Sequence, residues 1–102
     1  MYNICTNEPF FEWDERKNVS NQRKHGVSFS EARSVFWDPH AKDFFDAEHS
    51  NGEDRAILLG ISEYLRVLAV CHCLSQKGTM IRIVSARKAG AEEEKGYWRD
   101  RQ

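Results

Sequence analysis

Hydrophobic residues follow two different periods along the chain, and the change falls near residue 42. Before it, apolar positions recur at the three- and four-residue spacing of helices, whereas after it they alternate as in strands. The aromatic-rich segment 10–13, bounded by Pro9 and Asp14, departs from the helical period and predicts a brief strand. Residues 1–9 are expected to form a loosely held lead-in to that strand.

The first helix is predicted over residues 15–24. Asp14 is of the residue type that caps helix N-termini, and Gly26 is of the type that ends helices. Val19 is the only aliphatic residue of this helix, so the helix is polar on nearly every side. Such a helix either lies on the surface or presents polar groups to a ligand.

A second helix is predicted over residues 29–37. Ser28 and Glu31 have the spacing of a capping box at its start, and Asp38-Pro39 ends it. Its core-facing stripe comprises Phe29, Ala32, Val35 and Phe36.

The second part of the chain predicts four strands joined by short loops. They are expected over residues 41–45, 55–61, 64–74 and 79–86, with a loop at 46–53, a tight connection at 62–63 and a turn at 76–78. The third of these strands is apolar on both faces, which is typical of a central strand. A last helix is predicted from about residue 89, with Gly90 at its N-cap and glutamates in its first turn, where negative charge suits the helix dipole.

The predicted order of elements is therefore β-α-α-β-β-β-β-α. Four consecutive strands with short connections indicate an antiparallel sheet with the helices gathered on one side, an α+β fold. The 102 residues, of which 40% are hydrophobic, suffice for a single domain over residues 1–102 with a modest core.

The balance of charge excludes a protein that binds nucleic acid through bulk positive charge, because 15 basic and 16 acidic residues give a net charge of −1. The distribution is uneven, however. Residues 26–63 carry 3 basic and 8 acidic residues, whereas residues 64–102 carry 8 basic and 4 acidic ones. The basic last third makes a local anion site possible, and it also favours an acidic or amphipathic partner segment.

No apolar run approaches the roughly 18–20 residues that span a bilayer, and the N-terminus lacks the pattern of a signal peptide. We therefore expect a cytoplasmic protein with no membrane contact. The three cysteines, an odd number, fit reduced thiols. A zinc site is not expected, because a strand would point His72 away from both Cys71 and Cys73.

Basic and polar side chains on the first predicted helix form the first candidate site. Lys17, Asn21 and Lys24 share one face at i, i+4 and i+7, and His25 follows at the helix end. Together they could bind a phosphate or transfer a proton. The alternative interpretation is a solvated helix surface.

Arginines on the predicted strands form the second candidate site, and they comprise Arg55, Arg66, Arg82 and Arg87. Arg82 stands in an apolar strand, so its guanidinium must meet water, a carboxylate or a bound anion. Strict alternation places Arg82 on one face of the strand and Ser85 with Arg87 on the other, although Arg87 lies near the strand end, where alternation can break down. The guanidinium geometry suits phosphate; the alternative is a salt bridge to Asp43, Asp46, Glu53 or Asp54.

The remaining chemistry-bearing residues are His49 in the predicted loop and His72 on the predicted central strand. A lone histidine is more often structural than catalytic, and the aromatic residues are mostly expected in the core. The chain has no nucleophile elbow, no Gly-rich phosphate loop and no paired carboxylates at fixed spacing.

An ordered set of residues over about positions 11–98 resembles the BrnT toxins, with the ten residues before Phe11 as an extension. The set comprises Phe11–Asp14, Lys17, Asn21, Lys24–Phe29, Glu31-Ala32, Val35-Phe36, Asp38-Pro39, His49-Ser50, Glu53, Arg55, Gly60, Ile81–Ala89, Glu93 and Tyr97. The resemblance implies a RelE-like fold and a type II toxin that acts as a ribonuclease and blocks translation. It also implies a BrnA-like ribbon-helix-helix antitoxin, whose complex with the toxin binds operator DNA and represses its own operon.

A metal-independent ribonuclease can use the RNA 2′-hydroxyl as the nucleophile, so no cofactor is expected. Our hypothesis is that Arg55, Arg82 and Arg87 hold the scissile phosphate, with added charge from Lys24. His25 is the expected proton-transfer residue, because the usual pKa of a histidine suits that role at neutral pH, and His72 is the second choice. Further RNA contacts are expected from Lys17, Asn21, His72 and Ser85.

A rival hypothesis is a catalytically inert binding module that acts only as a co-repressor with a DNA-binding partner. Expression of such a module alone would leave RNA intact. Direct DNA binding by this chain is disfavoured, because a net charge of −1 neutralises few phosphates.

Overall fold

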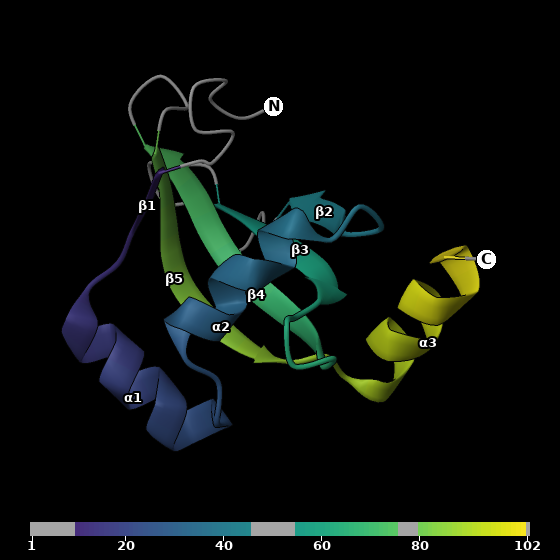
Figure 1. The fold of residues 1–102 in the computed structure, drawn as a ribbon, viewed down its shortest axis with the longest axis horizontal. Coiled ribbons are helices and arrows are strands. Elements are labelled where there is room, and N and C mark those ends of the chain that lie inside the picture. The colour runs from purple at the N-terminus through teal and green to yellow at the C-terminus, as the bar shows by residue number, and fades with distance from the viewer. Residues whose placement is uncertain (1–9, 46–54, 76–79, 102) are drawn as a thin grey trace.

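The computed structural model describes residues 10–45, 55–75 and 80–101 (Figure 1). In chain order the elements are β1 (Phe10–Glu12), α1 (Glu15–His25), α2 (Phe29–Ser34), a 3₁₀ turn η1 (Val35–Trp37), β2 (Lys42–Phe45), β3 (Arg55–Ile61), β4 (Val67–Ser75), β5 (Met80–Lys88) and α3 (Ala91–Arg101). The predicted order of helices and strands is confirmed. The predicted lead-in at 1–9, the loop at 46–53 and the turn at 76–78 lie outside the described residues.

The helix ends follow the predicted capping chemistry. The Asp14 carboxylate accepts a hydrogen bond from the Arg16 amide at 2.8 Å, and Gly26 ends α1 in the left-handed conformation with φ 69°. The Ser28 hydroxyl accepts a hydrogen bond from the Glu31 amide at 3.0 Å. The second helix is shorter than predicted, because the regular α-helix ends at Ser34 and the next three residues tighten into η1.

The sheet has the strand order β1-β5-β4-β3-β2. The four consecutive strands β2 to β5 pair antiparallel, as predicted, and β4 lies at the centre. The sheet is nevertheless mixed, because β1 pairs parallel with β5 and aligns Glu12 with Arg82. This pairing places β1 at one edge of the sheet, beside β5.

The two faces of the sheet carry two separate hydrophobic clusters. The inner face, covered by α1 and α2, holds Val27, Phe29, Ala32, Val35, Leu58, Leu68, Val70, Ile83 and Ala86. The outer face holds Leu59, Val67, Ala69 and Tyr97, the last of which comes from α3. Tyr97 also donates a hydrogen bond of 2.6 Å to Asp38, so α3 is fastened over one end of the outer face.

The hairpin between β3 and β4 is wider than predicted. The strand begins at Val67 rather than at residue 64, because the connection spans Ser62 to Arg66 and Leu65 adopts a positive φ of 63°. Arg66 turns back from this hairpin and binds the buried carboxylate of Glu31 on α2, with an Nε–Oε2 distance of 2.9 Å. The Ser62 hydroxyl donates to the same carboxylate at 2.7 Å, so the hairpin and α2 share one buried polar network.

A β-bulge in β5 decides which side chains face outward. Cys71 pairs with Ser85 and His72 pairs with Ile83, so Val84 is an extra residue opposite β4. The bulge shifts the alternation by one position. Arg82, Ser85 and Arg87 therefore all lie on the outer face, and the prediction that Ser85 and Arg87 face away from Arg82 is wrong.

Candidate ribonuclease site

A row of side chains crosses the outer face of the sheet near the β1 edge. Arg55 on β3 pairs with Cys73 on β4, Cys73 pairs with Arg82 on β5, and Arg82 aligns with Glu12 on β1. Directly paired residues project from the same face. Two strand spacings separate the Cα atoms of Arg55 and Arg82 by about 10 Å, so both guanidinium groups can reach one small anion between them.

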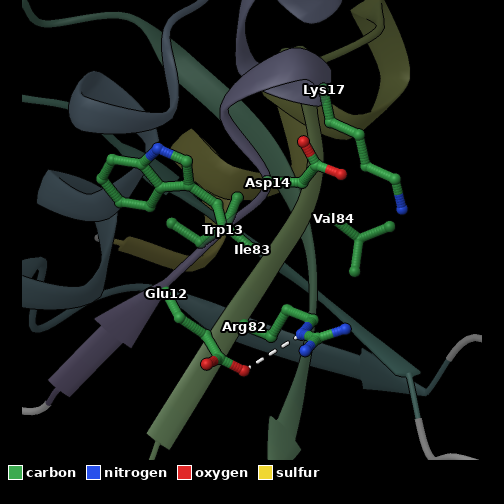
Figure 2. A pocket seen from close by; sticks show the side chains of 7 residues that line it. All are labelled: Glu12, Trp13, Asp14, Lys17, Arg82, Ile83 and Val84. Atoms are coloured by element: carbon green, nitrogen blue, oxygen red, sulfur yellow. Dashed lines mark hydrogen bonds and ion pairs between the residues drawn. The ribbon is translucent and has the colours of Figure 1, made fainter.

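Arg82 is paired with Glu12, and the distance from Nε to Oε2 is 3.0 Å (Figure 2). The Arg82 side chain is 55% exposed and the Glu12 side chain is 35% exposed. The partners considered from the sequence were Asp43, Asp46, Glu53 and Asp54. Asp43 lies instead near His72, and the other three lie outside the described residues. Glu12 was not among the predicted site residues, because the parallel pairing of β1 with β5 was not predicted.

A pocket of about 320 Å³ opens beside this ion pair (Figure 2). It is lined by Glu12, Trp13, Asp14, Lys17, Arg82, Ile83 and Val84. Lys17 projects from the first turns of α1 toward the strand that carries Arg82. The structure thus brings two of the predicted site residues, Lys17 and Arg82, to one pocket.

Arg87 lies outside this pocket. It follows Arg82 by five positions along β5, which is about 16 Å of strand. Its guanidinium forms two hydrogen bonds to Glu93 of α3, at 2.8 and 3.0 Å, and these bonds raise the pKa of Arg87. The Arg87 hydrogen bonds also hold the pKa of Glu93 below its usual value. Arg87 therefore joins the outer face to α3 and does not converge with Arg55 and Arg82 on one point.

Two asparagines explain why α1 is polar on the side that packs against the fold. Asn21 is buried, and its Nδ2 donates to the carbonyls of Val27 and Ala86 at 2.8 Å each. Its Oδ1 accepts from the Ala86 amide at 3.1 Å, so the side chain binds the backbone of β5 as a neighbouring strand would. Asn18, also buried, accepts from the Phe29 amide at 2.9 Å. The position of Asn21 contradicts the RNA-binding role expected for it, since its hydrogen-bonding groups serve the fold.

Lys24 and His25 are exposed in the last turn of α1. Eight residues of helix separate His25 from Lys17, a distance of about 12 Å along the axis. Lys24 is only one residue closer. The structure therefore places both residues away from the pocket that contains Arg82.

His72 is buried on the inner face of the sheet, with its ring 4.9 Å from the Phe36 ring. Burial lowers the pKa of His72, against smaller opposing effects of the Val70 carbonyl and Asp43. The His72 imidazole faces the core on the side of the sheet opposite Arg82, and this position does not support the RNA-binding role expected for it. Ser85 is exposed on the outer face beside the arginines.

The two strand cysteines, Cys71 and Cys73, lie on the outer face, with His72 on the inner face as predicted. Within residues 10–45, 55–75 and 80–101, no three His, Cys, Asp or Glu side chains gather in a way that could hold a metal ion. No helix in these same ranges is long and apolar enough to cross a membrane.

Comparison with known proteins is consistent with this geometry. A solved structure described as the Brucella abortus ribonuclease toxin BrnT superposes with a TM-score of 0.61 and 24% sequence identity, covering 80% of this chain and 97% of that one. This likeness shows the fold. No curated protein sequence matches the chain. A family model described as the ribonuclease toxin BrnT of type II toxin-antitoxin systems matches residues 13–93, and the chain therefore belongs to the BrnT family of ribonuclease toxins.

Proposed function

We propose that this BrnT-family chain is a metal-independent endoribonuclease whose outer sheet face binds RNA. The observation that carries the proposal is the placement of Arg55 and Arg82 on one face, about 10 Å apart across the central strand. Guanidinium groups bind phosphate through paired hydrogen bonds and stabilise the charge that develops on a phosphorane. The 2′-hydroxyl of RNA can then attack the adjacent phosphate without a metal ion when the protein supplies proton transfer.

The surrounding residues extend this binding face. Lys17 adds positive charge beside Arg82 in the pocket. Ser85 and Arg87 follow along β5 and contact the RNA beyond the scissile phosphate, where Arg87 exchanges Glu93 for a phosphate. Lys24 and His25, at the far end of α1, assist RNA binding through charge and polar contacts rather than the chemical step.

The biological role follows from the family and the charge distribution. A type II toxin has an antitoxin, and we propose a BrnA-like ribbon-helix-helix protein. An acidic or amphipathic segment of the antitoxin would cover the basic outer face and exclude RNA, and the joint complex would bind operator DNA through the antitoxin. Free toxin would cleave RNA in the cytoplasm and so inhibit translation.

The test uses Arg82→Ala and Arg82→Lys in the purified chain, with cleavage of a labelled RNA measured in EDTA. Loss of a guanidinium that stabilises transition-state charge is expected to lower kcat/KM by about 100-fold or more. Lysine keeps the positive charge but lacks the planar guanidinium, so kcat/KM is expected to fall less in Arg82→Lys than in Arg82→Ala. Because the Arg82–Glu12 pair is largely exposed, removing it costs about 1 kcal/mol of stability or less.

Arg33→Ala is the matched control, because it removes an exposed arginine from the last turn of α2 on the other side of the sheet. It is expected to cleave at the wild-type rate. Wild-type activity in Arg82→Ala would contradict the arginine assignment. A wild-type chain that leaves RNA intact yet co-represses with its antitoxin would favour the inert binding module.

A further inference from the structure

Glu12 lies beside Arg82 in the proposed ribonuclease site. It is the last residue of β1, and its alignment with Arg82 places its carboxylate on the outer face at the rim of the pocket (Figure 2). The carboxylate accepts a hydrogen bond at Oε2 from the Arg82 Nε, and its side chain is about one-third exposed. The Glu12 carboxylate is thus held 3.0 Å from the guanidinium that is proposed to bind the phosphate.

We propose that Glu12 is the general base that removes the proton from the attacking 2′-hydroxyl. This inference rests on the proposed function, because it assigns a further role in the same site. A general base must lie within hydrogen-bond reach of the proton it takes. A phosphate bound to Arg82 brings the neighbouring 2′-hydroxyl beside the Glu12 carboxylate.

The reaction balances as an intramolecular transphosphorylation. Glu12 takes the proton of the 2′-hydroxyl, O2′ forms a bond to phosphorus, and the bond between phosphorus and O5′ breaks. The leaving O5′ takes a proton from the Lys17 ammonium, which lines the same pocket. The products are a 2′,3′-cyclic phosphate and a 5′-hydroxyl end, and Glu12 and Lys17 then return to their starting states by proton exchange with water.

The other candidate bases in the described residues are already committed or lie elsewhere. Asp14 lines the pocket but caps α1 by accepting from the Arg16 amide. Both oxygens of Glu93 are bound to Arg87. His25 lies at the far end of α1, and His72 faces the core.

The experiment compares Glu12→Gln with Glu63→Gln in the full chain, on an RNA oligonucleotide with one cleavage site. Glutamine keeps an oxygen that can accept from Arg82 but cannot act as a base. We expect kcat to fall by about 100- to 1,000-fold, with KM within threefold of wild type and an unchanged melting temperature. Glu63 is exposed in the β3–β4 hairpin, at the opposite end of the strands from Arg82, so Glu63→Gln makes the same change of charge away from the pocket and is expected to stay within threefold of wild-type activity.

The pH profile separates a base from a merely structural partner of Arg82. The wild-type rate falls on acidification as the base becomes protonated, and this acid limb should vanish from the residual activity of Glu12→Gln. Glu12→Asp retains a carboxylate on a shorter side chain and should recover part of the rate together with the acid limb. The charged groups that face Glu12 in the pocket are Asp14, Lys17 and Arg82, so the profiles of all variants are recorded at constant ionic strength.

Three results would overturn the inference. They are a near-wild-type rate in Glu12→Gln, an increase in KM without a fall in kcat and with the acid limb intact, and a larger loss in Glu63→Gln than in Glu12→Gln. If Arg82→Ala is inactive in the same assay, the proposed function survives any of these. If the wild-type chain cleaves RNA that has a 2′-deoxy group at the cleavage site, the proposed function itself fails.

Discussion

Replacing Asn21 with alanine tests whether this buried amide serves the fold or the RNA. The substitution removes three hydrogen bonds to backbone groups, two to the carbonyls of Val27 and Ala86 and one from the Ala86 amide. A net contribution of about 1 kcal/mol for each bond gives a loss of about 3 kcal/mol in the free energy of unfolding. The free energy of unfolding of a small domain is only about 5–15 kcal/mol in total, so this loss is a large part of it. At several degrees for each kcal/mol, the melting temperature should fall by roughly 15 °C.

The free energy of unfolding is measured by urea titration with far-ultraviolet circular dichroism. Gln22→Ala is the control, because Gln22 is exposed next to Asn21 and its side chain makes a single bond of 3.3 Å to Asn18. Gln22→Ala is expected to lower the free energy of unfolding by less than about 1 kcal/mol. At a temperature where both variants are folded, Asn21→Ala should cleave RNA at the wild-type rate. Unchanged stability together with weakened RNA binding would refute the structural role.

Three further substitutions test the stability of the fold. Burial alone would raise the pKa of Glu31, but hydrogen bonds from Arg66 and Ser62 hold it below 4.5. Because the pKa of Glu31 is lower in the folded chain than in the unfolded chain, its ionised carboxylate stabilises the fold above the unfolded pKa, and this contribution is lost as the pH falls. The free energy of unfolding of the wild type should therefore decrease below about pH 4.5, and that of Glu31→Gln should decrease less. Urea titrations at pH 6 and pH 3.5 measure both decreases, and equal decreases would contradict this prediction. Gly60→Ala brings a methyl group to 2.9 Å from the Ala41 Cβ and should cost about 1–3 kcal/mol. At Gly96 on α3 the atom nearest to an added methyl group is a side-chain nitrogen of Arg99 at 3.5 Å, so Gly96→Ala should raise the free energy of unfolding by about 0.5–1 kcal/mol. Thermal melts of both glycine variants check the two values, and a Gly60→Ala variant more stable than Gly96→Ala would refute the packing argument.

The order of helices and strands could be predicted because each boundary has a local chemical signal. Asp14, Gly26 and Ser28 define helix ends through bonds to their immediate neighbours. The parallel pairing of β1 with β5 has no such signal, since it joins segments about 70 positions apart. The bulge at Val84 has no such signal either, because residues 83–86 are apolar or small and fit either face of the sheet.

In the candidate site, too, only residues with a local signal in the sequence could be identified. Arg82 could be identified from the sequence, because an arginine within an apolar strand needs a polar environment. Assigning Asn21 and His72 correctly required knowledge of the contacts that bury them, and those contacts come from β5 and from Phe36. Glu12 escaped attention because its partner could be found only once the sheet order was known.

The pairing of β1 with β5 has a consequence for the timing of activity. Arg82 is synthesised 70 positions after Glu12. A nascent chain that stops before β5 lacks the edge on which β1 docks, so it has neither the ion pair nor the pocket beside it. Under the proposed function, translation that terminates before residue 80 therefore yields a fragment in which the proposed ribonuclease site is not assembled.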